Sequence, residues 1–135
     1  MMEERRRYKR LDAVGTVVIK PEAGTSRTVR ADLINISFTG ITTVYVQEKI
    51  EAGIYVKLEL ISQLWNKPVI CKGKIIHTEE IGEYDPNVFR MGIEFIDIDK
   101  KAIQNILNLI QANILAEVRK RHSKRNPPIN KKSWL

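Results

Sequence analysis

The sequence has few of the residues that build disulfides, metal clusters or catalytic triads. Its 135 residues include one cysteine, Cys71, and two histidines, His77 and His122. A lone cysteine excludes an internal disulfide and a cysteine-based metal cluster, and it favours a reducing compartment such as the cytoplasm. Neither histidine has the neighbours of a catalytic triad, and the apolar stretch around His77 favours a structural role for it. We therefore expect no catalytic residues, no metal site and no cofactor.

Long apolar runs and glycine-rich phosphate loops are also missing. No run approaches the roughly 18 apolar residues that would cross a bilayer. The N-terminus is charged where a secretory signal would have an apolar core. These absences predict a cytoplasmic protein with no transmembrane segment. The hydrophobic content of 43% and the length fit one domain with one core.

Positive charge is concentrated at the two ends of the chain, although the whole sequence has a net charge of +7. Residues 1–10 hold five basic and two acidic side chains, and residues 119–135 hold seven basic side chains and no acid. The remaining eleven basic and fourteen acidic residues give the middle a net charge of −3. Aromatic residues make up only 7% of the chain. Because single-stranded nucleic acid is bound by basic grooves with stacked aromatics, nucleic acid is an unlikely partner.

Short β-rich segments separated by turn signals fill the first hundred residues. They are rich in β-branched residues, and several alternate with period 2, which is typical of half-buried strands. In the second segment we expect Val29, Ala31, Leu33 and Asn35 to share a face. The pattern predicts a mainly β fold, either a closed barrel or a sandwich. The six segments are 13–20, 27–37, 41–47, 54–61, 69–80 and 88–98.

The hydrophobic period changes near residue 100, where a C-terminal helix is expected to begin at Lys100. Asp97 or Asp99 would cap its N-terminus. The apolar stripe of this helix either docks on its own barrel or pairs with the same helix of another subunit. After Arg121 the periodicity ends, and two prolines follow in a basic tail. The stripe consists of Ile103, Ile106, Leu107, Ile110, Ile114, Leu115 and Val118.

Two short motifs stand out. One is the basic segment Arg6-Arg7-Tyr8-Lys9-Arg10, which contains Arg-x-x-x-Arg. The other is Asn35-Ile36-Ser37-Phe38-Thr39-Gly40, an Asn-x-Ser-x-x-Gly at the end of a strand. Each alone is common, because basic leaders often contain spaced arginines and Asn, Ser and Gly favour turns, the glycine by accepting a positive φ. Their occurrence together, about 25 residues apart on a six-stranded pattern, is the informative observation.

This combination resembles the PilZ domain family, as does the segment Arg90-Met-Gly-Ile-Glu-Phe-Ile-Asp-Ile98. The resemblance covers roughly residues 4–120 and implies a bacterial receptor for cyclic di-GMP. It also implies a six-stranded antiparallel β-barrel with a C-terminal helix at its mouth. The expected parts are a flexible basic leader (1–12), the barrel (13–99), the helix (100–121) and a flexible basic tail (122–135).

The resemblance implies that cyclic di-GMP binds between the leader and the Asn/Ser turn. An arginine can grip phosphate oxygens or the O6/N7 edge of guanine with two parallel hydrogen bonds, and it can stack on a purine. We expect Arg6 and Arg10 to make such contacts and Arg5 to assist, because the alternative register would pair Arg5 with Lys9, which has no planar fork. Asn35 and Ser37 would supply polar atoms, and Gly40 would let the backbone turn sharply beside the ligand.

Two interpretations of the function follow. In the first, the chain is a stand-alone receptor whose leader becomes ordered around the ligand and signals to an unidentified downstream protein partner. In the second, it is a PilZ-like interaction or oligomerisation module that does not bind the nucleotide, and the C-terminal helix forms a homo-oligomer. The sequence does not indicate which process is regulated.

Overall fold

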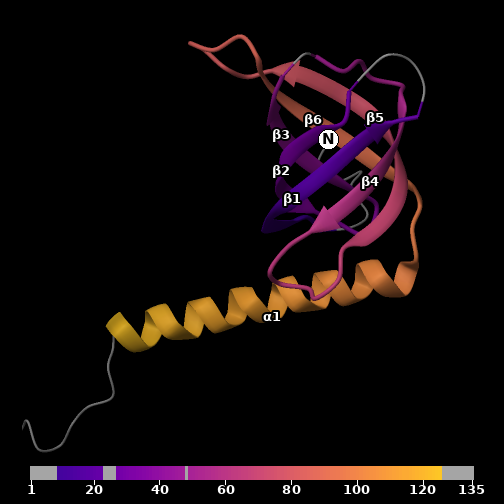
Figure 1. Ribbon diagram of the computed structural model, residues 1–135. Helices are drawn as coiled ribbons and strands as arrows, with labels where there is room; N and C mark the ends of the chain where they lie inside the picture. Colours follow the sequence, from indigo (N-terminus) through magenta and orange to yellow (C-terminus); the bar gives the residue numbers. More distant parts are fainter. Residues whose placement is uncertain (1–8, 23–26, 48, 126–135) are drawn as a thin grey trace, which may run out of the picture.

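The computed structural model describes residues 9–22, 27–47 and 49–125. In this part of the chain six strands are followed by one long helix (Figure 1). The strands are β1 (Leu11–Pro21), β2 (Val29–Ile36), β3 (Gly40–Val46), β4 (Tyr55–Ile61), β5 (Val69–Glu80) and β6 (Val88–Asp97), and the helix is α1 (Lys100–Arg125).

The strands close into an antiparallel barrel in the order β1-β2-β3-β6-β5-β4. β2 pairs with β1 and β3, and β5 pairs with β4 and β6, while β3 lies beside β6 and β1 pairs with β4 to close the barrel. Closure leaves no strand of the barrel with an unpaired edge, which protects a small β domain from edge-to-edge association. The predicted six-stranded barrel with a C-terminal helix is therefore confirmed.

The barrel interior is filled by side chains that alternate along each strand. Val17, Val56, Leu60, Ile75 and Met91 are completely shielded from solvent. Within this core the indole Nε1 of Trp65 donates a hydrogen bond to the carbonyl of Leu60 at 3.0 Å. Burial of Cys71, together with the nearby Asp97, raises the pKa of its thiol to about 12. The thiol therefore stays protonated at neutral pH, as expected for a packing residue rather than a nucleophile.

The helix α1 begins where the sequence predicts, and Asp99 rather than Asp97 is its N-cap. The Asp99 carboxylate accepts a hydrogen bond from the backbone N–H of Lys101 at 2.9 Å, and its carbonyl accepts from Ile103. The first half of α1 covers one end of the barrel with Ile103, Ile106 and Ile110, all about 1% exposed or less.

The second half of α1 projects beyond the barrel (Figure 1). Every residue from Gln111 to His122 is exposed, including Ile114, Leu115 and Val118. The apolar stripe thus divides into a docked part and an uncovered part, so the expected docking on the barrel accounts for only half of it.

Candidate functional site

The Asn-x-Ser-x-x-Gly motif forms the tight connection between β2 and β3. The backbone N–H of Ser37 donates to the carbonyl of Gly40 at 2.8 Å. The Ser37 hydroxyl oxygen accepts hydrogen bonds from the backbone N–H groups of Thr39 and Gly40 at 3.2 and 3.3 Å. Ser37 is buried, so its side chain fixes the shape of this turn.

Gly40 is required by a close approach between strands. A Cβ atom at this position would collide with the backbone carbonyl oxygen of Ile93 on β6. Among the described residues Gly53 is the glycine with a positive φ, so the expectation of a positive φ at Gly40 is wrong. Its role is to let the turn lie directly against β6.

Arg10 lies beside this turn, immediately before β1. Its Nη1 atom donates to the hydroxyl of Thr42 on β3 at 3.4 Å. A small cavity of about 70 Å³ is lined by Arg10, Ser37 and Gly40 from the two motifs. The other residues around the cavity are Thr39, Ile41, Ile76, His77, Gly92, Ile93 and Glu94. The fold therefore brings the described arginine of one motif next to two residues of the other.

Asn35 lies next to the cavity rather than in its lining. It pairs with Asp12 on β1 and with Thr42 on β3, just after a register shift between Leu33 and Asn35. Because of this shift Asn35 is only partly buried and Ile36 points into the core, so the expected alternation ends at Leu33. The buried side-chain oxygen of Asn35 has no hydrogen-bond partner among the residues that the structure describes. Such an acceptor is uncommon in proteins and suits a ligand donor.

Arg5 and Arg6 lie outside the described residues, so their predicted contacts stay predictions. The cavity also includes residues that the sequence analysis did not select as binding residues, among them Thr39, His77 and Glu94. Thr39 is exposed and its hydroxyl shares a hydrogen bond of 3.2 Å with Ser37. Its position inside the second motif could have identified Thr39 from the sequence. His77 lies 37 residues after Gly40, and nothing in the sequence links it to the motif.

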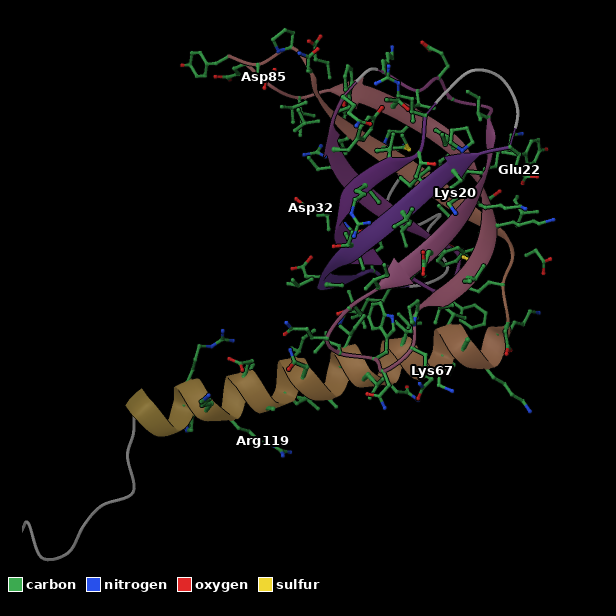
Figure 2. The ribbon with its side chains drawn as sticks, viewed as in Figure 1. Lys20, Glu22, Asp32, Lys67, Asp85 and Arg119 are labelled. Carbon is green, nitrogen blue, oxygen red and sulfur yellow. The ribbon has the colours of Figure 1, made fainter. Side chains whose placement is uncertain are left out.

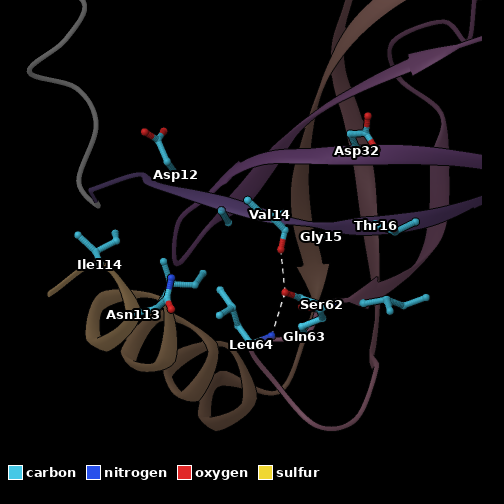
Figure 3. Close-up of a pocket in the computed structure, with 13 residues that line it drawn as sticks. Asp12, Val14, Gly15, Thr16, Asp32, Ser62, Gln63, Leu64, Asn113 and Ile114 are labelled. Carbon is cyan, nitrogen blue, oxygen red and sulfur yellow. Dashed lines mark hydrogen bonds between the residues drawn. The ribbon is translucent and has the colours of Figure 1, made fainter. Parts of the chain in front are cut away.

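A larger groove of about 730 Å³ lies between β1, the β4–β5 connection and α1 (Figure 3). The Ser62 hydroxyl links two sides of this groove. It donates a hydrogen bond to the Val14 carbonyl on β1 at 2.7 Å and accepts one from the backbone N–H of Leu64 at 3.1 Å. The carboxylates of Asp12 and Asp32 line it. Two carboxylates would repel phosphate groups, so this groove is unsuited to an anionic nucleotide.

Nowhere in 9–22, 27–47 and 49–125 do three or more His, Cys, Asp or Glu side chains gather in a way that could hold a metal ion. Within the same ranges, no helix combines the length and apolarity that crossing a membrane requires.

Comparison with known families decides the classification. The family model described as "PilZ domain" matches residues 4–112. The chain belongs to the PilZ domain family. No curated protein sequence matches it.

Solved structures share the PilZ fold with this chain at low sequence identity. The Escherichia coli structure "PilZ domain with c-di-GMP of YcgR" has a TM-score of 0.66 and 18% identity, over 86% of this chain and 98% of that one. Bacillus subtilis "Inhibitor of motility (MotI/DgrA)" has a TM-score of 0.62 and 22% identity over 86% of this chain. The K. pneumonia "MrkH-c-di-GMP complex" has a TM-score of 0.64 and 12% identity over 87% of this chain. This chain spans 52% of the MotI/DgrA chain and 55% of the MrkH chain.

Proposed function

We propose that this PilZ domain is a non-enzymatic bacterial receptor for cyclic di-GMP in the cytoplasm. The observation that carries the proposal is the meeting of Arg10 with Ser37 and Gly40 at one cavity on the barrel surface. The two motifs are separated in sequence, and the fold places their described residues together. Solved PilZ structures with c-di-GMP bound support the same ligand.

The size of the cavity beside Arg10 limits which part of the ligand can enter it. About 70 Å³ admits a phosphate group or one edge of a guanine, not a whole dinucleotide. The rest of the ligand would therefore lie on the outer face of the barrel, within reach of the arginines that precede Arg10. Arg6 and Arg10 would clamp it with Arg5 as an additional contact, and Asn35 would accept a hydrogen bond from it.

A cavity shared by the leader, the β2–β3 turn and α1 supports a connection between the ligand and the helix. A second cavity, of about 440 Å³, is lined by Lys9 and Leu11 at the end of the leader, by Phe38 in the β2–β3 turn and by Leu107 on α1. Leader, turn and helix therefore border one space. Ordering of the leader around the nucleotide would change the surface beside α1, and a downstream protein partner would read that change.

Calorimetric titration with three nucleotides tests the proposed function. We expect cyclic di-GMP to bind and cyclic di-AMP to bind at least roughly tenfold more weakly, because the adenine edge lacks the O6 acceptor that an arginine fork recognises. GTP should also bind at least roughly tenfold more weakly, because it presents one guanine instead of two. Absence of heat and of any thermal stabilisation with cyclic di-GMP would contradict the proposal.

The uncovered half of α1 favours a second candidate function, self-association. Its apolar residues Ile114, Leu115 and Val118 are 38%, 51% and 46% exposed, and Val14 in the adjoining groove is 82% exposed. The helix continues into the basic residues Arg119, Lys120 and Arg121, and Arg119 points away from the barrel (Figure 2). The groove carries Asp12 and Asp32. Antiparallel pairing of two copies would therefore place the basic end of each helix near the acidic groove of the other.

Light scattering tests this pairing. We expect twice the chain mass of 15.6 kDa for the wild-type protein. The double substitution Leu115→Glu/Val118→Glu should give the monomer mass, because charges would be forced into the apolar contact. Ala112→Glu/Ala116→Glu adds the same charges on the side of the helix that faces away from Ile114 and Val118 and should leave the dimer intact. A monomeric wild-type protein, or dissociation by both double variants alike, would rule out pairing through this face.

A further inference from the structure

The strand β5 departs from regular alternation next to the proposed nucleotide site. Ile75 pairs with Ile93 and His77 pairs with Gly92, so Ile76 is an extra residue on β5. As a consequence both Ile76 and His77 are exposed on the outer face of the barrel, although neighbours in a regular strand point to opposite faces. Bulges of this kind re-aim side chains and are frequent beside functional sites.

Gly92 on β6 provides the space that the His77 ring occupies. A Cβ atom at position 92 would lie 2.6 Å from Nδ1 of His77 and would also collide with Cε1. The backbone of Gly92 does not have a positive φ, so its conformation alone does not require glycine. The structure shows that it accommodates an imidazole.

The ring lies over Gly92 and is otherwise exposed. Neither ring nitrogen of His77 has a hydrogen-bond partner in the part of the chain that the structure describes. His77 nevertheless borders the cavity that contains Arg10, Ser37 and Gly40. The exposed ring is therefore accessible to a ligand in that cavity.

We propose that His77 is a further binding residue of the cyclic di-GMP site, with a ring N–H that donates a hydrogen bond to a phosphate or guanine oxygen of the ligand. Neutral imidazole has one N–H donor, and the protonated ring has two. Arg10 and His77 would then approach the nucleotide from different strands, and the exposed Ile76 would offer an apolar surface beside it. This inference rests on the proposed function, because it concerns the same ligand.

Calorimetry on exposed-site variants tests the role of His77. We expect His77→Ala to bind cyclic di-GMP about tenfold more weakly, the usual effect of losing a hydrogen bond to a charged ligand. His77→Phe keeps an aromatic ring without a hydrogen-bond donor, so its affinity for cyclic di-GMP should fall as much as that of His77→Ala. His77→Gln keeps an N–H donor and should retain most of the wild-type affinity. Lys72→Ala, an exposed change on β5 away from the cavity, should bind normally.

Two outcomes separate this inference from the function on which it rests. Wild-type affinity in His77→Ala, with Arg10→Ala still defective, would overturn the role of His77 and leave the receptor intact. No binding by the wild-type protein would overturn both.

A double-mutant cycle tests whether Gly92 acts by providing the space that the His77 ring occupies. In the wild-type background Gly92→Ala should displace the ring and weaken binding about as much as His77→Ala. In the His77→Ala background it should change the affinity less than about twofold, because no ring is left to displace. Equal losses in both backgrounds would show that Gly92 does not act through His77.

Discussion

Replacement of Arg10 by alanine is expected to weaken cyclic di-GMP binding by at least about 100-fold. An arginine fork on phosphate or guanine makes two charge-assisted hydrogen bonds, each of about 1.5–3 kcal/mol. The hydrogen bond from Arg10 to Thr42 holds the guanidinium beside the Ser37 turn before the ligand arrives, which reduces the entropy lost on binding. Titration calorimetry measures the affinity, and far-ultraviolet circular dichroism should show an unchanged fold because Arg10 is exposed.

Two further variants define what the Arg10 result means. Arg10→Lys keeps the charge but has no planar fork, so we expect an intermediate affinity. Arg30→Ala removes an exposed arginine toward the other end of β2 and should change the affinity little. Equal losses in Arg10→Ala and Arg30→Ala would mean that only overall charge matters. By the same chemistry Arg6→Ala should resemble Arg10→Ala.

Truncation of Ile106 to alanine is expected to destabilise the protein by about 3 kcal/mol. Ile106 is 1% exposed where α1 covers the end of the barrel, and removing buried methyl groups leaves a cavity as well as losing burial. For a chain of this size the melting temperature should fall by roughly 10 °C. Thermal unfolding followed by circular dichroism measures the change.

Ile114→Ala is the matched control, because it makes the same truncation two turns further along α1. Ile114 is 38% exposed, so its truncation should cost less than about 1 kcal/mol in dilute protein, where self-association is weak. If the two substitutions destabilise equally, α1 does not dock on the barrel as described.

Local patterns in the sequence were sufficient to predict the strands and the start of the helix, whereas the choice of a barrel over a sandwich came from the resemblance to the PilZ family. The segment 69–80 matches β5 to the residue, because its β-branched residues lie between a proline and a glycine-containing turn. Helix α1 begins at Lys100 because Asp99 supplies a cap that the sequence displays. Both features depend on neighbouring residues, which is why they are readable without the fold.

Features that arise from pairing between distant strands were not predictable. The bulge at Ile76 exists because β5 and β6 pair in a shifted register, and nothing in the local sequence marks that shift. The role of Gly92 likewise depends on a residue 15 positions earlier that lies opposite it. The division of α1 into docked and uncovered halves depends on where the barrel ends, while the apolar stripe continues without change. The contributions of Arg5, Arg6, Arg10, Asn35, Ser37 and Gly40 to binding stay predictions.

The position of Phe38 has a thermodynamic consequence. This residue belongs to the turn that carries Ser37 and Gly40, and it also borders the space beside Leu107 of α1. If an occupied turn alters how readily two helices associate, association must alter nucleotide affinity by the same factor. Dilution would then change the apparent dissociation constant, and the concentration of the protein itself would set the messenger level at which it responds.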